Sequence, residues 1–319
     1  MKRLLPAALV LTLFLIPFSL VAHAQEEGLV PTQALVKIDS KSTPPANASA
    51  LTVSVNDHKE PLTSWAPVVP ANAQVALLID DGLRESMGRE LDNLRNFVRT
   101  LPPGVEILVG YMQYGSVVQD QPFTTDHVLA ATTLHLPQGM PGMSASPYLC
   151  ISDFVKKWPS SAASSSSSGM GMSSPRKARF IVMITDGVDP YNGSTSINNQ
   201  DSPYVATAVT DAQRAGVAVY AIYFPDAGIR GGRADFSGQS YLQQITEATG
   251  GVNLWEGVGS PVSTAPFLSI FQRALGETYV ATFNAPASSK PERDLVRVKF
   301  SAPKVKLHAP EAVRVGNLE

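Results

Sequence analysis

The chain has 319 residues, of which 44% are hydrophobic and 16% charged, so it can build a sizeable core and is not a globally disordered protein. Its formal net charge of −2 gives no indication of the strongly basic domain or stripe that marks a nucleic-acid-binding protein, and we expect no nucleic-acid partner. Cys150 is the only cysteine in the sequence, which excludes a disulfide bond within the chain.

The first residues, 1–24, have the pattern of a secretory signal peptide. Lys2 and Arg3 precede an apolar run at residues 4–21, and Ala22-His23-Ala24 supplies small residues at the cleavage positions. This pattern predicts cleavage after Ala24 and a secreted or periplasmic, extracytoplasmic bacterial protein. A retained membrane anchor stays open, because the apolar run approaches the length of a membrane span. No later segment is apolar for long enough to cross a bilayer, so no membrane span is expected after cleavage.

Residues 25–73 form a leader that is rich in Pro, Ala, Ser and Thr. Within it, residues 34–38 and 51–55 alternate between apolar and polar side chains. Alternation of this kind predicts short edge strands or hairpins in an otherwise loosely ordered segment. Prolines at 67 and 70 then mark a boundary before a central domain at residues 74–278.

The central domain opens with five consecutive apolar residues at 75–79, which are typical of a strand buried on both faces of a parallel sheet. Asp80 and Asp81 follow this strand, and Gly82 permits a tight turn. In open α/β sheets, ligands bind beyond the carboxyl ends of the strands. Asp80 is therefore the first residue to consider for function.

Strand and helix patterns alternate through the rest of this domain. They predict a doubly wound α/β fold whose six-stranded sheet is mostly parallel and carries helices on both faces. One edge strand, at residues 117–123, is expected to return antiparallel through a hairpin turn at Tyr114-Gly115-Ser116. The further strands are predicted at 105–113, 178–185, 217–224 and 252–255, and the helices at 86–100, 127–133, 148–158, 203–215, 241–249 and 266–275.

Three segments lie outside this regular pattern. Residues 159–176 are rich in Ser and Gly and are predicted to be a disordered insertion. Residues 228–238 are expected to form a Gly-rich loop. The tail, residues 279–319, contains three runs typical of strands and is predicted to form a small antiparallel β element added at the end of the central domain.

Ile181-Val182-Met183-Ile184-Thr185-Asp186-Gly187 resembles the fourth strand of von Willebrand factor type A domains and its Thr-Asp-Gly ending. The first strand with its acidic turn and the order of elements over residues 74–278 are similar to the same family. A loop with Ser144 falls where the family carries the third segment of its metal site. More narrowly, the signal peptide, the short leader and the β tail resemble secreted type A-related proteins common in acidobacterial genomes.

The resemblance implies a metal-ion-dependent adhesion site, in which oxygen ligands hold a hard cation such as Mg²⁺ or Ca²⁺. The family uses Asp-x-Ser-x-Ser after the first strand, a Thr in a later loop and an Asp after the fourth strand. Asp80 and Asp186 match the two acids, and Ser144 stands in for the Thr. Gly82 and Arg84 occupy the two Ser positions, so the implied site is degenerate.

Arg84 changes the electrostatics of this site, because its guanidinium is a permanent cation beside the carboxylates. We expect it to pair with Asp80 or Asp186 and to take the electrostatic role of a metal. Two alternatives stay open: a metal held by Asp80, Ser144 and Asp186, or a cation moved onto Asp186, Asp189 and Asn192.

Enzymatic functions find little support in the sequence. Phosphoryl transfer at acidic strand ends requires a nearby cation to hold the phosphate. No Lys occurs between Lys59 and Lys156, and Lys177 precedes its strand rather than following it. Motifs for serine hydrolases, zinc proteases and phosphate-binding loops are absent from the sequence. Cys150 shares a helical face with Phe154 and Trp158, which favours a packing role.

The sequence therefore predicts an exported, non-catalytic binding module that contacts a protein, envelope or surface partner at the carboxyl edge of its sheet. The alternatives are a structural module of an envelope complex with a vestigial site and, in third place, a phosphoryl-transfer enzyme. The residues predicted to form the binding edge are Asp80, Asp81, Gly82, Arg84, Ser144, Asp186 and Gly187.

Overall fold

The computed structural model describes residues 28–39, 51–83, 85–140, 146–160, 176–189, 202–225, 232–257, 260–287 and 294–317. The predicted signal peptide, Arg84, Ser144, Asn192 and most of the insertion at 159–176 lie outside these residues. Within the described part of the chain, no helix has both the length and the apolar character that crossing a membrane requires.

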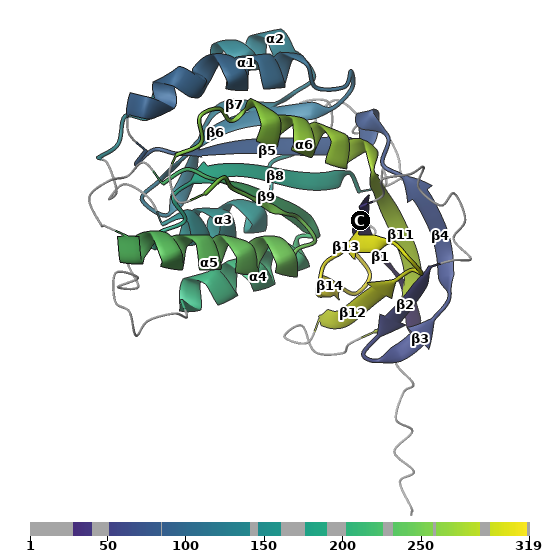
Figure 1. Cartoon of the computed structure of the whole chain (residues 1–319). Helices are drawn as coiled ribbons and strands as arrows, with labels where there is room; N and C mark the ends of the chain where they lie inside the picture. Colours follow the sequence, from purple (N-terminus) through teal and green to yellow (C-terminus); the bar gives the residue numbers. More distant parts are fainter. Residues whose placement is uncertain are drawn as a thin grey trace, which may run out of the picture.

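A six-stranded sheet lies at the centre of the α/β part, in the order β10-β9-β8-β5-β6-β7 (Figure 1). All neighbouring strands run parallel except β6 and β7, which form the antiparallel edge pair. This arrangement confirms the predicted sheet. The strands are β5 (Ala73–Asp80), β6 (Glu106–Gln113), β7 (Ser116–Thr124), β8 (Ala178–Thr185), β9 (Val217–Tyr223) and β10 (Asn253–Leu254).

Helices cover both faces of this sheet, as predicted. Alternate residues of β5 point to opposite faces, so Leu77 packs into one core and Leu78 into the other. One core includes Phe271, whose ring packs against those of Phe97 and Tyr220. The helices on that face are α1 (Leu91–Arg99), α2 (His127–Thr132) and α6 (Ala265–Gly276), and those on the other are α3 (Pro147–Lys156), α4 (Pro203–Arg214) and α5 (Gly232–Ala248).

Two helices begin differently from the prediction. The helix predicted at 86–100 starts as a 3₁₀ helix, η3 (Glu85–Glu90), before α1. The loop predicted at 228–238 is wrong in its second half, because α5 already begins at Gly232. A Cβ at position 238 would lie 2.2 Å from the carbonyl oxygen of Asp186. Gly238 thus lets α5 approach the end of β8, and this packing outweighs the poor helix propensity of glycine.

The remaining strands form a β sandwich of two four-stranded sheets, in the orders β13-β1-β11-β4 and β14-β12-β2-β3. Val36, Val53 and Phe283 lie in the core between the two sheets. The first sheet contains β1 (Leu29–Asp39), β4 (Leu62–Pro67), β11 (Thr278–Pro286) and β13 (Lys306–His308), and the second contains β2 (Thr52–Val55), β3 (His58–Glu60), β12 (Leu295–Ser301) and β14 (Ala312–Arg314).

The sandwich corrects two predictions. The segments at 34–38 and 51–55 belong to interior strands rather than edge strands, although β2 does form a hairpin with β3. The tail strands do not form a separate element, because they pair with strands of the leader. Neither set can bury its apolar face alone, because an isolated two-stranded hairpin is only marginally stable in water. Because the paired segments are so distant in sequence, no local pattern in the sequence could predict which strands pair.

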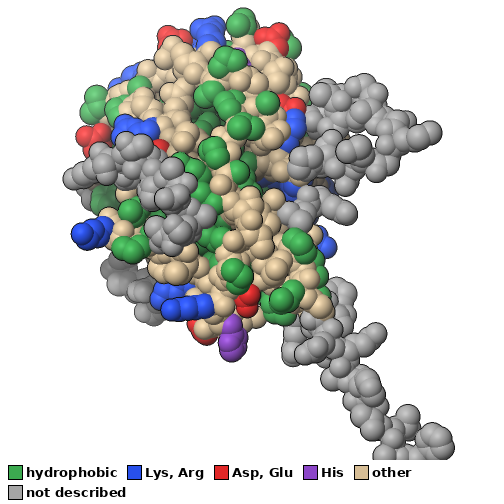
Figure 2. All heavy atoms as spheres, turned by 90° about the vertical axis from the view of Figure 1, so that its right-hand side faces the viewer, with side chains coloured by type: hydrophobic (Ala, Val, Ile, Leu, Met, Phe, Trp, Pro, Cys, Tyr) green, Lys and Arg blue, Asp and Glu red, His purple; other side chains and the backbone are tan. Residues whose placement is uncertain are grey.

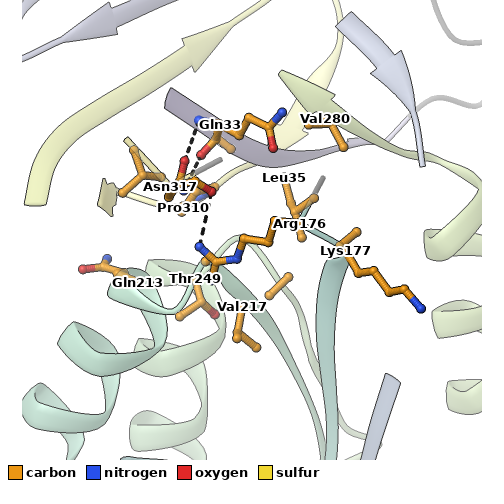
Figure 3. A pocket seen from close by; sticks show the side chains of 15 residues that line it. Gln33, Leu35, Arg176, Lys177, Gln213, Val217, Thr249, Val280, Pro310 and Asn317 are labelled. Carbon is orange, nitrogen blue, oxygen red and sulfur yellow. Dashed lines mark hydrogen bonds between the residues drawn. The ribbon is translucent and has the colours of Figure 1, made fainter. Parts of the chain in front are cut away.

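The sandwich packs against the amino-terminal edge of the central sheet, at the starts of β8 and β9. A cavity of about 40 Å³ lies between them, and Figure 3 shows its lining. The Asn317 side chain accepts a hydrogen bond from the Gln33 backbone N–H (2.7 Å) and donates one to the Gln33 carbonyl (2.9 Å). Arg176 donates to the Asn317 carbonyl at 3.4 Å. The carboxyl edge of the sheet therefore lies at the end opposite the sandwich (Figure 1).

Figure 2 looks onto the side of the sandwich. Hydrophobic side chains gather along the middle of this face, and most Lys and Arg side chains lie toward its margins. The strongly exposed apolar residues of the carboxyl edge, described next, belong to other elements: the turn between β6 and β7, and the loop after α2.

Candidate functional site

Asp80 ends β5 at the carboxyl edge of the sheet and is 5% exposed. Its Oδ2 accepts a hydrogen bond from the Thr185 hydroxyl on β8 at 2.6 Å, and its Oδ1 accepts one from the Gly82 backbone N–H at 2.8 Å. The carboxylate thus joins two neighbouring strand ends and fixes the turn at Gly82. Asp80 lies where the sequence predicts it, within a hydrogen-bonded strand end.

Asp186 and Gly187 follow β8 at the same edge. The Asp186 Oδ1 accepts from the Val188 N–H at 2.9 Å, and the Gly187 N–H donates to the Thr185 hydroxyl at 3.0 Å. Gly187 has a φ of +69°, a left-handed conformation that favours glycine. Its carbonyl accepts from the Tyr148 hydroxyl at 2.7 Å. Helix α3 is thereby fastened to the turn after β8.

Tyr148, whose hydroxyl contacts this turn, lies in a buried and negatively charged environment. Its side chain is fully buried, and burial raises the pKa of its hydroxyl well above the ordinary value. The negative charges of Asp186, Asp189 and Asp80 raise the pKa further. The ends of β5 and β8 meet at the Thr185 hydroxyl, which donates to the Asp80 carboxylate and accepts from the Gly187 N–H, so the structure brings Asp80 and the turn after Asp186 together.

Asp189 connects the starts of two helices. It is fully buried and accepts hydrogen bonds from the Ser146 hydroxyl at 3.3 Å and from the Ser202 hydroxyl at 2.8 Å. Ser146 caps α3 and Ser202 caps α4, each by accepting from a backbone N–H of the first turn. Neither serine is among the predicted site residues. The Ser-Pro pair at the start of each helix could have identified them as helix caps, because Pro is favoured at the first helical position.

Asp81 holds the loop that follows α2. Its Oδ1 accepts from the Gln138 N–H at 2.8 Å, and its carbonyl accepts from the Gly139 N–H at 3.0 Å. Burial raises the pKa of Asp81, and the hydrogen bond from Gln138 opposes this change. The loop is held a second time where the Tyr111 hydroxyl donates to the His135 carbonyl at 2.6 Å. Asp81 is thus an anchor for a surface loop.

Three exposed apolar side chains, here called the rim residues, project from the segments next to these anchors. Tyr114 is 73% exposed, Leu136 43% and Met140 63%. Tyr114 lies in the two-residue turn between β6 and β7 with a φ of +46°, which is unusual for a residue other than glycine. Leu136 and Met140 flank the loop bound by Asp81. The hairpin turn predicted at residues 114–116 already places Tyr114 at the surface, whereas no sequence pattern identifies Leu136 and Met140, whose exposure is set by the tertiary fold.

Of the ligands that the resemblance implies for Mg²⁺ or Ca²⁺, the described residues supply only Asp80 and Asp186. Such cations take about six or more oxygen ligands, whereas Gly82 has no hydroxyl to offer and Asp189 already binds two serine hydroxyls. Within the described ranges, no group of three or more His, Cys, Asp and Glu side chains could hold a metal ion. The roles predicted for Arg84, Ser144 and Asn192 fall outside those ranges and stay predictions.

No family model matches the chain, and no curated protein matches it. Among solved structures it is similar to an aerotolerance-related membrane protein from Bacteroides fragilis NCTC 9343, with 14% identity and a TM-score of 0.41, over 64% of this chain and 98% of that one. A von Willebrand factor type A structure from Catenulispora acidiphila has 10% identity and a TM-score of 0.41, over 91% and 75%. The ArnB paralog VWA2 from Sulfolobus acidocaldarius has 11% identity and a TM-score of 0.38, over 89% of this chain and 76% of that one. Likeness at this level says nothing of what the chain binds.

Proposed function

We propose that this chain is an exported, non-catalytic module that binds a protein or surface partner through the carboxyl edge of its sheet. The observation that carries the proposal is the set of rim residues, Tyr114, Leu136 and Met140, beside loops anchored by buried carboxylates. Large apolar side chains are enriched in the buried cores of interfaces. Because the anchored loop is already ordered, less conformational entropy is lost on binding.

The backbone of Tyr114 supports the same proposal. The two-residue turn between β6 and β7 requires positive φ at Tyr114 and Gly115, and for a residue other than glycine, such as Tyr114, this conformation costs about 1 kcal/mol or more. The exposed ring of Tyr114 contributes no core packing that would offset this cost. A contact with a partner gives this residue a role.

A non-catalytic role is supported by the state of the most nucleophilic side chain. Cys150 is fully buried in α3, and burial raises the pKa of its thiol far above the ordinary value. The nearby charge of Asp80 acts in the same direction. Because the thiolate is the reactive form, Cys150 is suited to packing and not to nucleophilic attack.

Binding at this edge is proposed to be independent of a metal, with Arg84 paired to Asp80 or Asp186. A cation that binds only the folded chain raises its melting temperature. We expect the addition of Mg²⁺, Ca²⁺ or Mn²⁺ to leave the melting temperature of the mature wild-type chain unchanged. The same cations should also leave the melting temperature of the Asp186→Ala variant unchanged. A cation-specific rise in the wild type that disappears in Asp186→Ala would instead restore the metal-dependent site.

Partner capture tests the edge directly. The immobilised mature chain is incubated with envelope extract, and the proteins retained by the wild type are compared with those retained by Tyr114→Ala and Arg84→Ser. Leu29→Ala is the matched control, since Leu29 is 61% exposed but lies on the sandwich. We expect Tyr114→Ala to lose a partner that Leu29→Ala retains. Equal capture by all variants would favour a structural envelope module with a vestigial site.

A further inference from the structure

A pocket of about 460 Å³ with an unusual charge lies on the far side of the molecule from the rim residues. Its walls come from the ends of α3 and α4, the start of β8, and β14 of the sandwich. Among the described residues, a single carboxylate, that of Asp211, lines it. The basic residues that line it are Lys156, Lys157, Arg176, Arg179, Arg214 and Arg314.

The acidic partners near this basic pocket do not neutralise it. Three carboxylates pair with four of the six basic side chains, which leaves three positive charges in excess among the described residues. The segment between Ser160 and Arg176 contains no Asp or Glu, in a chain whose formal net charge is −2. The pairs are Lys156 with Asp211 (2.9 Å), Lys157 with Asp153 (2.6 Å), and Arg214 and Arg314 with a shared Asp294 (3.0 and 3.5 Å).

The two arginines of β8 and its approach, Arg176 and Arg179, have no carboxylate partner in the part of the chain that the structure describes. Both donate to one acceptor, the carbonyl of Ala215 at the end of α4. Arg176 has one further acceptor, the Asn317 carbonyl at 3.4 Å (Figure 3). Capping a helix end accounts for one guanidinium, but each carries five N–H donors. Two guanidiniums at one carbonyl leave most of their donors available.

Arg179 is the more exceptional of the two. Its guanidinium lies 5.1 Å above the ring of Trp158, and its Nε is buried without a hydrogen-bond partner in the described part of the chain. Burial, together with the charge of Arg176, lowers the pKa of Arg179 to about 10. Burial and the charge of Arg314 likewise lower the pKa of Arg176 to about 10. An anion in the pocket would reduce the repulsion between these guanidinium groups and would accept hydrogen bonds from their remaining N–H donors.

We propose that the basic pocket binds a tetrahedral oxyanion group, phosphate or sulfate, carried by a ligand larger than the free ion. A guanidinium fork matches the oxygens of such a group in a bidentate manner. The three excess charges favour a multiply charged group over a single carboxylate, and the volume has the size of a small-molecule site. This site is separate from the proposed carboxyl-edge interface.

Inorganic pyrophosphate, phosphate and sulfate are the probes, with acetate at matched ionic strength as the control for screening. Binding is measured by the change in melting temperature and by the change in tryptophan fluorescence. The Trp158→Phe variant shows which part of the fluorescence comes from Trp158. We expect pyrophosphate to raise the melting temperature and change the Trp158 emission. Affinity should fall at least tenfold in Arg179→Gln and stay unchanged in Lys299→Gln, which alters an exposed cation on β12. A stronger response to sulfate than to phosphate would assign a sulfated ligand, and the reverse a phosphorylated one.

Arg179 is half-buried, so Arg314→Gln provides a second test at an exposed position of the pocket wall. This variant should fold normally and bind pyrophosphate severalfold more weakly. The proposal is overturned if acetate stabilises the chain as well as pyrophosphate does. It is equally overturned if Arg314→Gln and Lys299→Gln bind pyrophosphate with the same affinity as the wild type.

Discussion

A buried carboxylate is destabilised by the loss of water, and the hydrogen bonds that it accepts offset only part of that cost. Asp81 is in this position, 3% exposed and fixed by the Gln138 N–H. Asp80 and Asp189 engage their oxygens in the same way, with hydroxyl groups of the chain itself. At the residue scale, the acids of the carboxyl edge shape the loops around them.

The raised pKa of Asp81 predicts a pH dependence. The folded chain holds its proton at a higher pH than the unfolded chain does. The associated stability is present below the unfolded value, 3.8, and is lost as pH rises through the folded pKa. Asp81→Asn keeps the oxygen that accepts from Gln138 and removes this titration. Urea unfolding from pH 4 to 7 should show this variant gaining stability relative to the wild type as pH rises, and a constant difference would contradict the prediction.

Tyr114 gives a prediction about backbone strain. Asn tolerates positive φ better than Tyr, so Tyr114→Asn should raise the free energy of unfolding by about 0.5–1 kcal/mol. Tyr114→Ala is the matched control, because Ala removes the ring but retains the unfavourable Cβ. Urea denaturation of both variants separates the two causes. A gain in stability for Ala as large as that for Asn would show that the ring, and not the backbone, is unfavourable.

At the scale of elements, close backbone approach decides where helices can lie. Helix α5 contacts the turn after β8 through Gly238, and a Cβ at position 187 would lie 2.6 Å from the Gly238 carbonyl oxygen. Gly187 and Gly238 face each other in this way and bring a helix directly onto the candidate edge. In the sequence, glycines at these positions are typical of turns and loops, although Gly238 lies within a helix and permits its close packing.

Gly238→Ala should therefore destabilise the chain by about 1–3 kcal/mol, the usual cost of overpacking. Gly276→Ala in α6 is the matched control, since a Cβ at that position would meet nothing within 4 Å among the described residues. That change should be neutral or slightly stabilising. Thermal unfolding compares the two, and equal melting temperatures would contradict the close approach.

At the scale of the whole molecule, local patterns predict the α/β part and fail for the sandwich. Buried runs such as residues 75–79 and 180–184 identify central strands, because a parallel strand is apolar on both faces. The acids after these strands could be placed at one edge for the same reason. The partner of a half-buried strand such as β1 is not encoded nearby, so its place in a sandwich could not be predicted. The hydroxyl partners of Asp189 could not be predicted either, because they come from the starts of two helices that are distant from each other in the sequence.

Asn317 connects the end of the chain to β1, which predicts coupling between the two parts. Asn317→Ala leaves the N–H and C=O of Gln33 without their partners, at a cost of about 2 kcal/mol. We expect the melting temperature to fall by the same amount in far-UV circular dichroism and in tryptophan fluorescence. A shift in one signal only would show that the sandwich and the α/β part unfold separately.

The pairing of β1 with β11 also sets an order of events during synthesis. Gln33 lies opposite Thr282, 249 residues later in the chain. At about 5 to 20 residues per second, a ribosome needs roughly 12 to 50 seconds to cover that distance. Throughout this interval β1 is a strand without its neighbour, and an open edge of this kind invites pairing with other chains. We therefore expect the sandwich to be the last part of the chain to fold. A nascent chain arrested at residue 278 should remain open to proteolysis at residues 29–39, while the completed chain resists it.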